Sequence, residues 1–160
     1  MIYINIVCVG KLKEDYLRAA CAEYQKRLGA FCRLNIIELA PARLPESPND
    51  SQIAAALADE ADRILAKISN SDAVFAMCIE GKMLSSEALS AEIDKLAVDG
   101  FGSLCFVIGG SHGLDPKVKS RAKIRLSMSP MTFPHQLARV MLLEQIYRSF
   151  MISSGGKYHK

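Results

Sequence analysis

Histidine is the only side chain that ordinarily titrates near neutral pH, and this sequence has three that could move a proton. His135 opens a long helical segment, where capping or packing is an ordinary alternative role. His112 lies in a glycine-rich loop. His159 lies in a polar C-terminal tail, a segment that would usually fray and carry no function. The histidines are therefore candidates for a general base, and residue type alone does not choose between them.

The glycine-rich loop Ile108–Gly113 follows an apolar run and could let the backbone approach a ligand closely. Its G-G-x-x-G spacing differs from the G-x-G-x-x-G of dinucleotide-binding folds. Gly81 and Lys82 likewise lack the other residues of a phosphate-binding P-loop. The loop is thus a weak ligand signal, and a tight turn explains it equally well.

The segment Leu126–Pro134 contains no formally charged residue, although it links an expected strand to the final helix. A neutral loop of this kind suits an uncharged, sulfur-bearing or aromatic ligand that is recognised by backbone groups. A hydrophobic crossover into a subunit interface would have the same composition. Both interpretations stay open from the residue types.

Arg139 follows His135 by four residues, so the two share one face of the final helix. Its guanidinium could hold RNA or the carboxylate of a ligand, and a helix salt bridge is the alternative. Glu144 and Arg148 have the order and spacing of a simple intrahelical pair, and we interpret them as structural.

The net charge of +3 and the pI near 8.6 permit an RNA partner without requiring one. Five basic residues alternate along one stretch, as in an RNA-binding surface or a merely solvated one: Lys117, Lys119, Arg121, Lys123 and Arg125. The five cysteines are scattered and mostly set in apolar runs, so we expect reduced core thiols and no metal site.

These residues must be positioned by apolar runs that alternate about five times with segments of helical periodicity. The predicted strands cover 3–9, 33–39, 73–79, 103–108 and 123–128. The predicted helices cover 14–28, 51–68, 85–98, a short turn after 115–116, and 134–152. The alternation predicts a single α/β domain over residues 1–160, with a mostly parallel sheet covered on both faces. Because ligands bind at the carboxyl ends of such strands, residues 77–82, 109–113 and 128–133 should lie together.

The last helix is apolar over more than one stripe, and such a helix needs burial on two sides. In a domain this small, a second subunit is the simplest cover, which indicates a homodimer. The apolar N-terminal run is interrupted by Asn5 and lacks the features of a signal peptide. The stretch 133–152 is too polar to span a membrane. We therefore expect a cytoplasmic protein with no membrane partner.

Five ordered motifs resemble the ribosomal RNA large subunit methyltransferase H family, which is of the SPOUT class. They read Val9-Gly10-Lys11-Leu12-Lys13, Glu80-Gly81-Lys82, Val107-Ile108-Gly109-Gly110-Ser111, Met131-Thr132-Phe133-Pro134-His135-Gln136 and Tyr158-His159-Lys160. The resemblance spans essentially the whole chain. It implies an α/β fold with a C-terminal trefoil knot, a homodimer, and S-adenosyl-L-methionine as methyl donor. The implied reaction is methylation of N3 of a pseudouridine in 23S (large-subunit) ribosomal RNA.

The resemblance also implies where the donor binds. The implied positions are Met77, Gly109, Met128, Ser129, Pro130, Met131, Thr132 and Phe133. The chain departs from the family pattern at Met77, where leucine is usual, at Pro130, which stiffens the donor loop, and at Lys157. None of these changes removes a chemical group that the reaction needs. His112 is peripheral, because family members vary at that position.

Methylation of an imide nitrogen needs a neutral donor pocket, correct alignment and a group that removes a proton. We assign catalytic roles to Tyr158 and His159, and further candidate roles to His135 and Arg139. Tyr158 offers a flat face to a splayed-out base, and His159 accepts the proton. The mild charge favours the assembled ribosome over free RNA as substrate. A catalytically silent RNA-binding module and a homodimerising scaffold are the rival classes.

Overall fold

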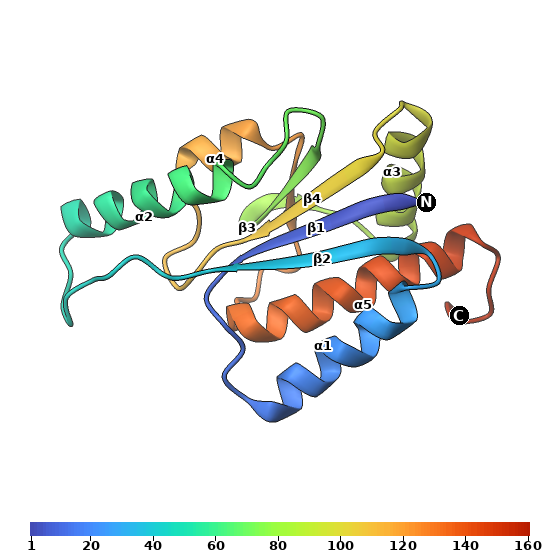
Figure 1. Cartoon of the computed structure of the whole chain (residues 1–160), viewed down its shortest axis with the longest axis horizontal. Coiled ribbons are helices and arrows are strands. Elements are labelled where there is room, and N and C mark those ends of the chain that lie inside the picture. The colour runs from blue at the N-terminus through green and yellow to red at the C-terminus, as the bar shows by residue number, and fades with distance from the viewer.

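Five parallel strands form a single sheet at the centre of the computed structural model, which describes all residues 1–160 (Figure 1). The sheet order is β2-β1-β4-β3-β5. The strands are β1 (Ile2–Val9), β2 (Cys32–Leu39), β3 (Ala73–Met83), β4 (Ser103–Ile108) and β5 (Ile124–Ser127). The central strands β1 and β4 are nearly continuous apolar runs because helices cover both faces. The predicted α/β class with a parallel sheet is confirmed.

Helices cover both faces of the sheet and create two apolar cores (Figure 1). On one face lie α1 (Asp15–Leu28), α3 (Ser86–Val98) and α5 (His135–Ser153), and on the other lie α2 (Asp50–Leu65) and α4 (Pro116–Arg121). None of these helices is both long and apolar enough to cross a membrane.

Side-chain capping explains where three of the five helices start. Asn49 forms a capping box with Gln52, and the Ser85 hydroxyl accepts from the Ala88 amide at 3.1 Å. Asp115 caps the short α4, which has Pro116 at its first position as expected. The predicted helix 51–68 ends earlier, at Leu65, and the amides of Lys67 and Ile68 bond to carbonyls only three residues back.

Strand β3 runs beyond its predicted end at residue 79, because it pairs with β5 twice. Leu126 is the partner of both Met77 and Lys82, so the residues between them bulge out of the ladder. Gly81 closes the bulge against β5, where an added Cβ would lie 2.8 Å from the Arg125 carbonyl oxygen. The bulge directs residues 78–80 toward the carboxyl edge of the sheet.

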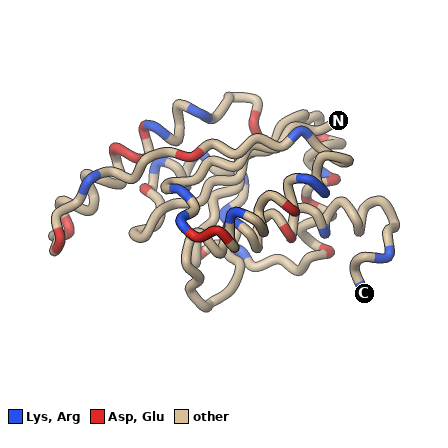
Figure 2. The backbone as a smooth tube through the Cα atoms, turned by 60° about the horizontal axis from the view of Figure 1, so that its bottom comes forward, with Lys and Arg blue, Asp and Glu red and all other residues tan.

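The alternating basic residues are engaged with the protein's own groups. Lys117 bonds Asp62 at 3.1 Å, and Lys119 pairs with Glu80. The others meet carbonyls or an aromatic ring: Arg121 donates to Ser69, Arg125 to Lys119, and Lys123 lies 5.3 Å from the Phe101 ring. In the view of Figure 2, basic and acidic residues are interspersed rather than gathered in one patch. These contacts favour the structural interpretation of the basic stretch.

Four of the five cysteines are buried, as expected for core thiols: Cys8, Cys21, Cys32 and Cys105. Burial raises the pKa of Cys8 and of Cys105 to about 12, so both thiols stay protonated at neutral pH. Cys78 differs, because the β3 bulge leaves it only partly buried at the carboxyl edge.

Candidate active site

A cleft of about 790 Å³, here called the carboxyl-edge cleft, opens where the sheet's strands end. It is lined by residues 77–80 at the β3 bulge, 108–114 after β4, and most of 126–135 between β5 and α5. This volume is in the range of small-molecule sites. The prediction that these three segments lie together is confirmed.

The cleft wall is almost free of charge. Glu80 and Lys119 are its two formally charged lining residues, and they pair with each other. The neutral β5–α5 loop contributes Met128, Ser129, Met131, Thr132 and Phe133, in agreement with the positions implied for a donor.

Pro130 is the exception among the expected donor residues, because it is exposed and does not line the cleft. The Ser129 hydroxyl accepts from the Met131 amide at 2.9 Å and closes a tight turn around it. The proline is therefore at the outer tip of the loop, and its contribution is stiffness rather than contact.

The glycine loop lines the cleft, but Gly109 is required for a reason that the sequence did not reveal. A Cβ on Gly109 would lie 2.8 Å from the Gly113 carbonyl carbon, and Gly110 and Gly113 form an isolated β-bridge. Gly109 lets the loop close on itself rather than leaving space for a ligand. The tight-turn interpretation thus describes how this wall of the cleft is built.

His135, the first residue of α5, lines the cleft and keeps an intermediate exposure. Burial lowers its pKa, and the nearby charges of Arg139 and Lys13 act in the same direction. The imidazole is therefore held neutral, which is the form that can accept a proton.

Arg139 lies behind the cleft and is not among its lining residues. It is 3% exposed, and its guanidinium donates to Glu38 of β2 at 2.7 Å and to the Gly10 carbonyl at 3.1 Å. The salt bridge considered for Arg139 exists, but it ties two elements together instead of two turns of α5. Together with the Lys13 amide bonded to Gln136 at 2.9 Å, it fixes the β1–α1 turn to the start of α5.

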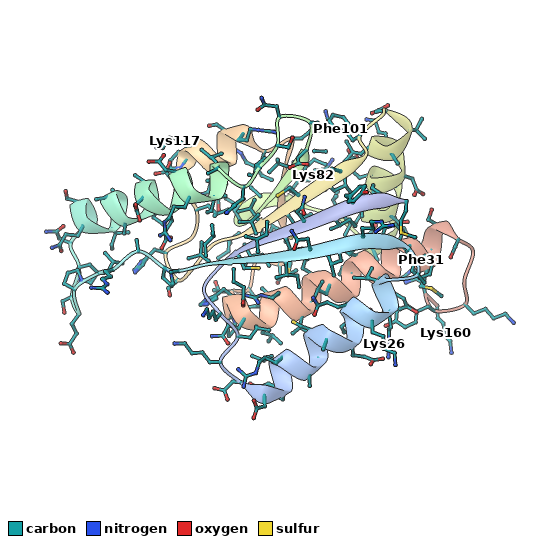
Figure 3. The ribbon with its side chains drawn as sticks, in the orientation of Figure 1. Lys26, Phe31, Lys82, Phe101, Lys117 and Lys160 are labelled. Carbon is teal, nitrogen blue, oxygen red and sulfur yellow. The ribbon has the colours of Figure 1, made fainter.

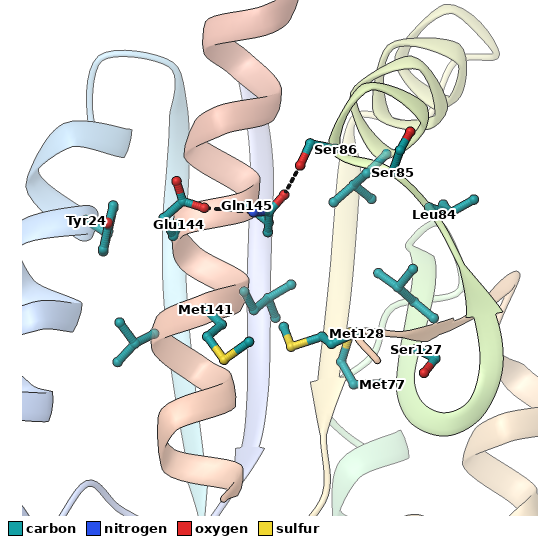
Figure 4. Close-up of a pocket in the computed structure, with 14 residues that line it drawn as sticks. Tyr24, Met77, Leu84, Ser85, Ser86, Ser127, Met128, Met141, Glu144 and Gln145 are labelled. Atoms are coloured by element: carbon teal, nitrogen blue, oxygen red, sulfur yellow. Dashed lines mark hydrogen bonds between the residues drawn. The ribbon is translucent and has the colours of Figure 1, made fainter. Parts of the chain in front are cut away.

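A second cleft, of about 560 Å³ and here called the α5 cleft, adjoins the first between α5 and the β3–α3 connection (Figure 4). Met77 and Met128 line both clefts, and Figure 4 shows Met141 of α5 facing them. One bond crosses the cleft, from the Ser86 hydroxyl to Gln145 at 2.7 Å. The wall is otherwise largely apolar, and no sequence pattern predicts this cleft.

The C-terminal tail folds back against residues 144–148 of α5, away from His135. The Tyr158 hydroxyl donates to Glu144 at 3.1 Å, and its ring meets Tyr147 edge-on with centroids 5.0 Å apart. Arg148 stacks on the same ring at 4.7 Å. Burial raises the pKa of Tyr158 to about 12, so the phenol remains a donor. Figure 3 shows Lys26, Phe31 and Lys160 at this same end of the molecule.

Both ring nitrogens of His159 are occupied. Nδ1 lies 3.1 Å from the Arg148 guanidinium, and Nε2 lies 2.6 Å from the Glu87 carboxylate. Arginine can only donate, so Nδ1 accepts and Nε2 carries the hydrogen that Glu87 receives. The structure thus separates the expected catalytic residues, with His135 at the carboxyl-edge cleft and Tyr158 and His159 in a network with Glu144, Arg148 and Glu87.

Comparisons with known proteins identify the family of this chain. The family model described as "Predicted SPOUT methyltransferase" matches residues 2–159. Proteins named ribosomal RNA large subunit methyltransferase H are similar over 157 residues, which is 98% of this chain and 99% of each relative. Those from Streptococcus equi subsp. zooepidemicus and Bifidobacterium adolescentis are both 50% identical, and that from Leuconostoc mesenteroides is 45% identical.

A solved structure has the same fold at low sequence identity. A probable methylase family protein from Haemophilus influenzae Rd KW20 aligns with a TM-score of 0.54 and 14% identity, covering 98% of this chain and 70% of its own. That likeness supports the fold alone, whereas the sequence relatives support the family. The chain belongs to the ribosomal RNA large subunit methyltransferase H family, a family of SPOUT methyltransferases that use S-adenosylmethionine.

Proposed function

We propose that this protein is a homodimer that methylates N3 of a pseudouridine in large-subunit ribosomal RNA, with S-adenosylmethionine as the donor. The observation that carries the proposal is the nearly uncharged cleft at the carboxyl edge. Seven of the eight residues implied for donor binding line it. We propose that the protein acts in the cytoplasm, on the assembled ribosome.

The residues of the carboxyl-edge cleft fit this donor. Bound S-adenosylmethionine would supply an electrophilic methyl group on a sulfonium cation. Thioethers, hydroxyls and backbone groups of Met77, Met128, Ser129 and Thr132 offer neutral contacts, and the glycine loop brings its backbone close. The sulfonium cation and the imide anion both become neutral when the methyl group is transferred. A neutral wall stabilises the separated ions poorly, so it favours the transfer.

The acceptor nitrogen must lose its proton, and two histidines are candidates. His135 is neutral and lines the cleft. His159 contacts Arg148, which lies about 20 Å along α5 from His135. A two-fold axis across α5 would bring the tail of the partner subunit to this subunit's His135. We propose that His159 and Tyr158 act across the dimer in this way, with His135 in the cleft wall and Arg139 as a positioning residue.

The homodimer is supported by the apolar surface around α5. Leu137, Met131 and Ile79 are 38%, 72% and 55% exposed near the cleft, and Met141 lines the adjoining α5 cleft. Exposed apolar side chains beside a binding cleft are typical of an interaction site. A second copy of α5 would cover both the helix and the α5 cleft.

The test is methyl transfer from labelled S-adenosylmethionine to ribosomes and to free ribosomal RNA, followed by mapping of the modified base. The proposal expects N3-methylation of one pseudouridine, with ribosomes the better substrate. Donor binding by calorimetry without any transfer would favour a silent RNA-binding module. A protein that binds neither donor nor RNA would be a scaffold.

A further inference from the structure

A third hollow, here called the side cavity, has a volume of about 200 Å³ and adjoins the carboxyl-edge cleft. His135 and the loop Gly110–His112 line both spaces. The far wall of the side cavity comes from α2 and from Pro41, Ala42 and Leu44 in the β2–α2 loop. A flat ligand at the shared border would therefore present one edge to each space.

Glu60 is an acid in an otherwise apolar part of this wall, beside Ile53, Ala56 and Leu57. It is 9% exposed, and its Oε2 accepts from the Ala42 amide at 2.8 Å. The other oxygen, Oε1, has no hydrogen-bond partner in the protein, yet it is not sealed away from solvent. A buried carboxylate with a free lone pair is costly unless a donor reaches it. The side cavity thus offers an acceptor to an N–H group.

Several hydrogen bonds connect α2, which carries Glu60, to the β2–α2 loop. Arg63, one turn along α2, donates to the Ala40 carbonyl at 2.5 Å and pairs with Asp59 at 3.1 Å. With the Glu60 bond to Ala42, these contacts fix the β2–α2 loop to α2. The Glu60 carboxylate is therefore held in place before any ligand binds, as a site that determines specificity requires.

Pseudouridine, the base proposed to receive the methyl group, has an N–H group that could reach the free oxygen of Glu60. Pseudouridine is joined to its ribose through C5, which frees N1 to carry a hydrogen. Uridine presents a C–H group at the corresponding edge. N1 and N3 flank the C2 carbonyl, so a base at the border could offer N3 to the carboxyl-edge cleft and N1 to the side cavity.

We infer that Glu60 is a specificity-determining residue that accepts the N1–H of the acceptor pseudouridine in the side cavity, and so distinguishes it from uridine. This inference rests on the proposed function. Exposed Lys11, Lys13 and Arg43 flank the same region without ion-pair partners, and they are suited to phosphates on either side of a splayed-out base. A structural role for Glu60 in holding Ala42 is compatible with this second role.

The first test compares ribosomal subunits that carry pseudouridine or uridine at the mapped acceptor position. Glu60→Gln keeps an oxygen for Ala42 but turns an amide N–H toward the base, where it opposes the N1–H. We expect transfer to pseudouridine to fall about tenfold or more, the effect of a lost hydrogen bond to a charged group, while transfer to uridine is unchanged. Asp50→Asn removes the same charge from an exposed residue of the same helix that does not line the side cavity, and it should keep the wild-type preference.

The second test fills the side cavity. Ala56→Leu adds bulk to its wall and should raise the KM for ribosomes, with donor affinity preserved. Ala55→Leu is the matched control, because Ala55 is exposed on the same helix and does not line the side cavity. Thermal unfolding and calorimetric donor binding establish that each variant is folded and loaded.

The outcomes separate this inference from the proposed function. If the wild-type protein methylates neither RNA, the proposed function fails and the inference fails with it. If the wild-type protein is active and a folded, donor-binding Glu60→Gln protein keeps the full preference for pseudouridine, only the role of Glu60 is overturned. If Ala56→Leu keeps the wild-type KM for ribosomes, the base does not enter the side cavity.

Discussion

The first and second halves of α5 carry the two parts of the proposed site, and these parts are held by different forces. In the first half, Arg139 is buried against Glu38 and the Gly10 carbonyl and supports His135 from behind. Beside the second half, His159 is held by side chains at the surface, and its partner Glu87 has a side chain that is 62% exposed. Buried pairs are costly to break, whereas exposed pairs contribute little. The carboxyl-edge cleft should thus be a fixed part of the fold, and the tail should be able to leave its position.

A clash in the glycine loop should have the largest effect on the fixed part. Gly109→Val places side-chain atoms on the Gly113 backbone, so the loop must shift. Because a displacement of about 1 Å can reduce a rate on the order of a hundredfold, we expect that loss in methyl transfer, with weaker donor binding. Gly110→Ala is the control, since its nearest neighbour would be a Val9 methyl at 3.4 Å. Equal donor affinity in both folded variants would remove the loop from the site.

Breaking the buried pair should destabilise the protein as a whole. Arg139→Met removes the hydrogen bonds that this buried guanidinium donates to Glu38 and to the Gly10 carbonyl, and we expect the free energy of unfolding to fall by about 2 kcal/mol in urea titrations. Arg18→Met removes an exposed pair with Asp15 and should change it by less than about 1 kcal/mol. Similar losses in the two variants would contradict the contrast between buried and exposed pairs.

Assembly should depend on the outer face of α5. Met141→Glu puts a carboxylate into the α5 cleft, so we expect the dimer dissociation constant to rise at least about tenfold in sedimentation experiments. Ala55→Glu, an exposed change on the opposite face of the sheet, should leave it unchanged. Leu143 is fully buried in the core, so its substitution would test folding instead. A stable monomer of the unmodified protein at micromolar concentration would refute the dimer.

The smallest expected effect concerns the protonation of His135. Its lowered pKa means that the neutral ring persists to a lower pH than the ordinary value of about 6.5 would allow. Lys13→Met removes one like charge, so the pKa of His135 should rise toward its ordinary value. An NMR titration of His135 in both proteins measures the shift. A midpoint above 6.5 in the unmodified protein would contradict it.

Much of this arrangement was predictable from local sequence patterns. Alternating apolar runs predicted the strands, and Asp115-Pro116 predicted the start of α4. Either Ser85 or Ser86 could start the next helix back along the chain, and the structure has Ser85 as the cap of α3. The meeting of three loops followed from the parallel sheet. The C-terminal knot is a property of how the chain threads, and it remains a prediction from family membership.

The missed features depend on contacts between segments that are distant in sequence. Pairing of Arg139 with Glu38 joins residues 101 positions apart, which helix periodicity does not report. The β3 bulge needs the β5 backbone as a partner. Glu60 did leave a signal, since it falls on the apolar stripe with Ile53, Leu57 and Ile64, and an acid at such a position needs a partner.

The most direct test of the fixed and movable halves is to remove the tail alone. A protein that ends at Lys157 should dimerise and bind S-adenosylmethionine as before, while methyl transfer to ribosomes falls on the order of a thousandfold, as expected for a lost general base. Mixing it with Gly109→Val should restore part of the activity through hybrid dimers if the tail serves the partner subunit. Full activity of the truncated protein on ribosomes would contradict the account.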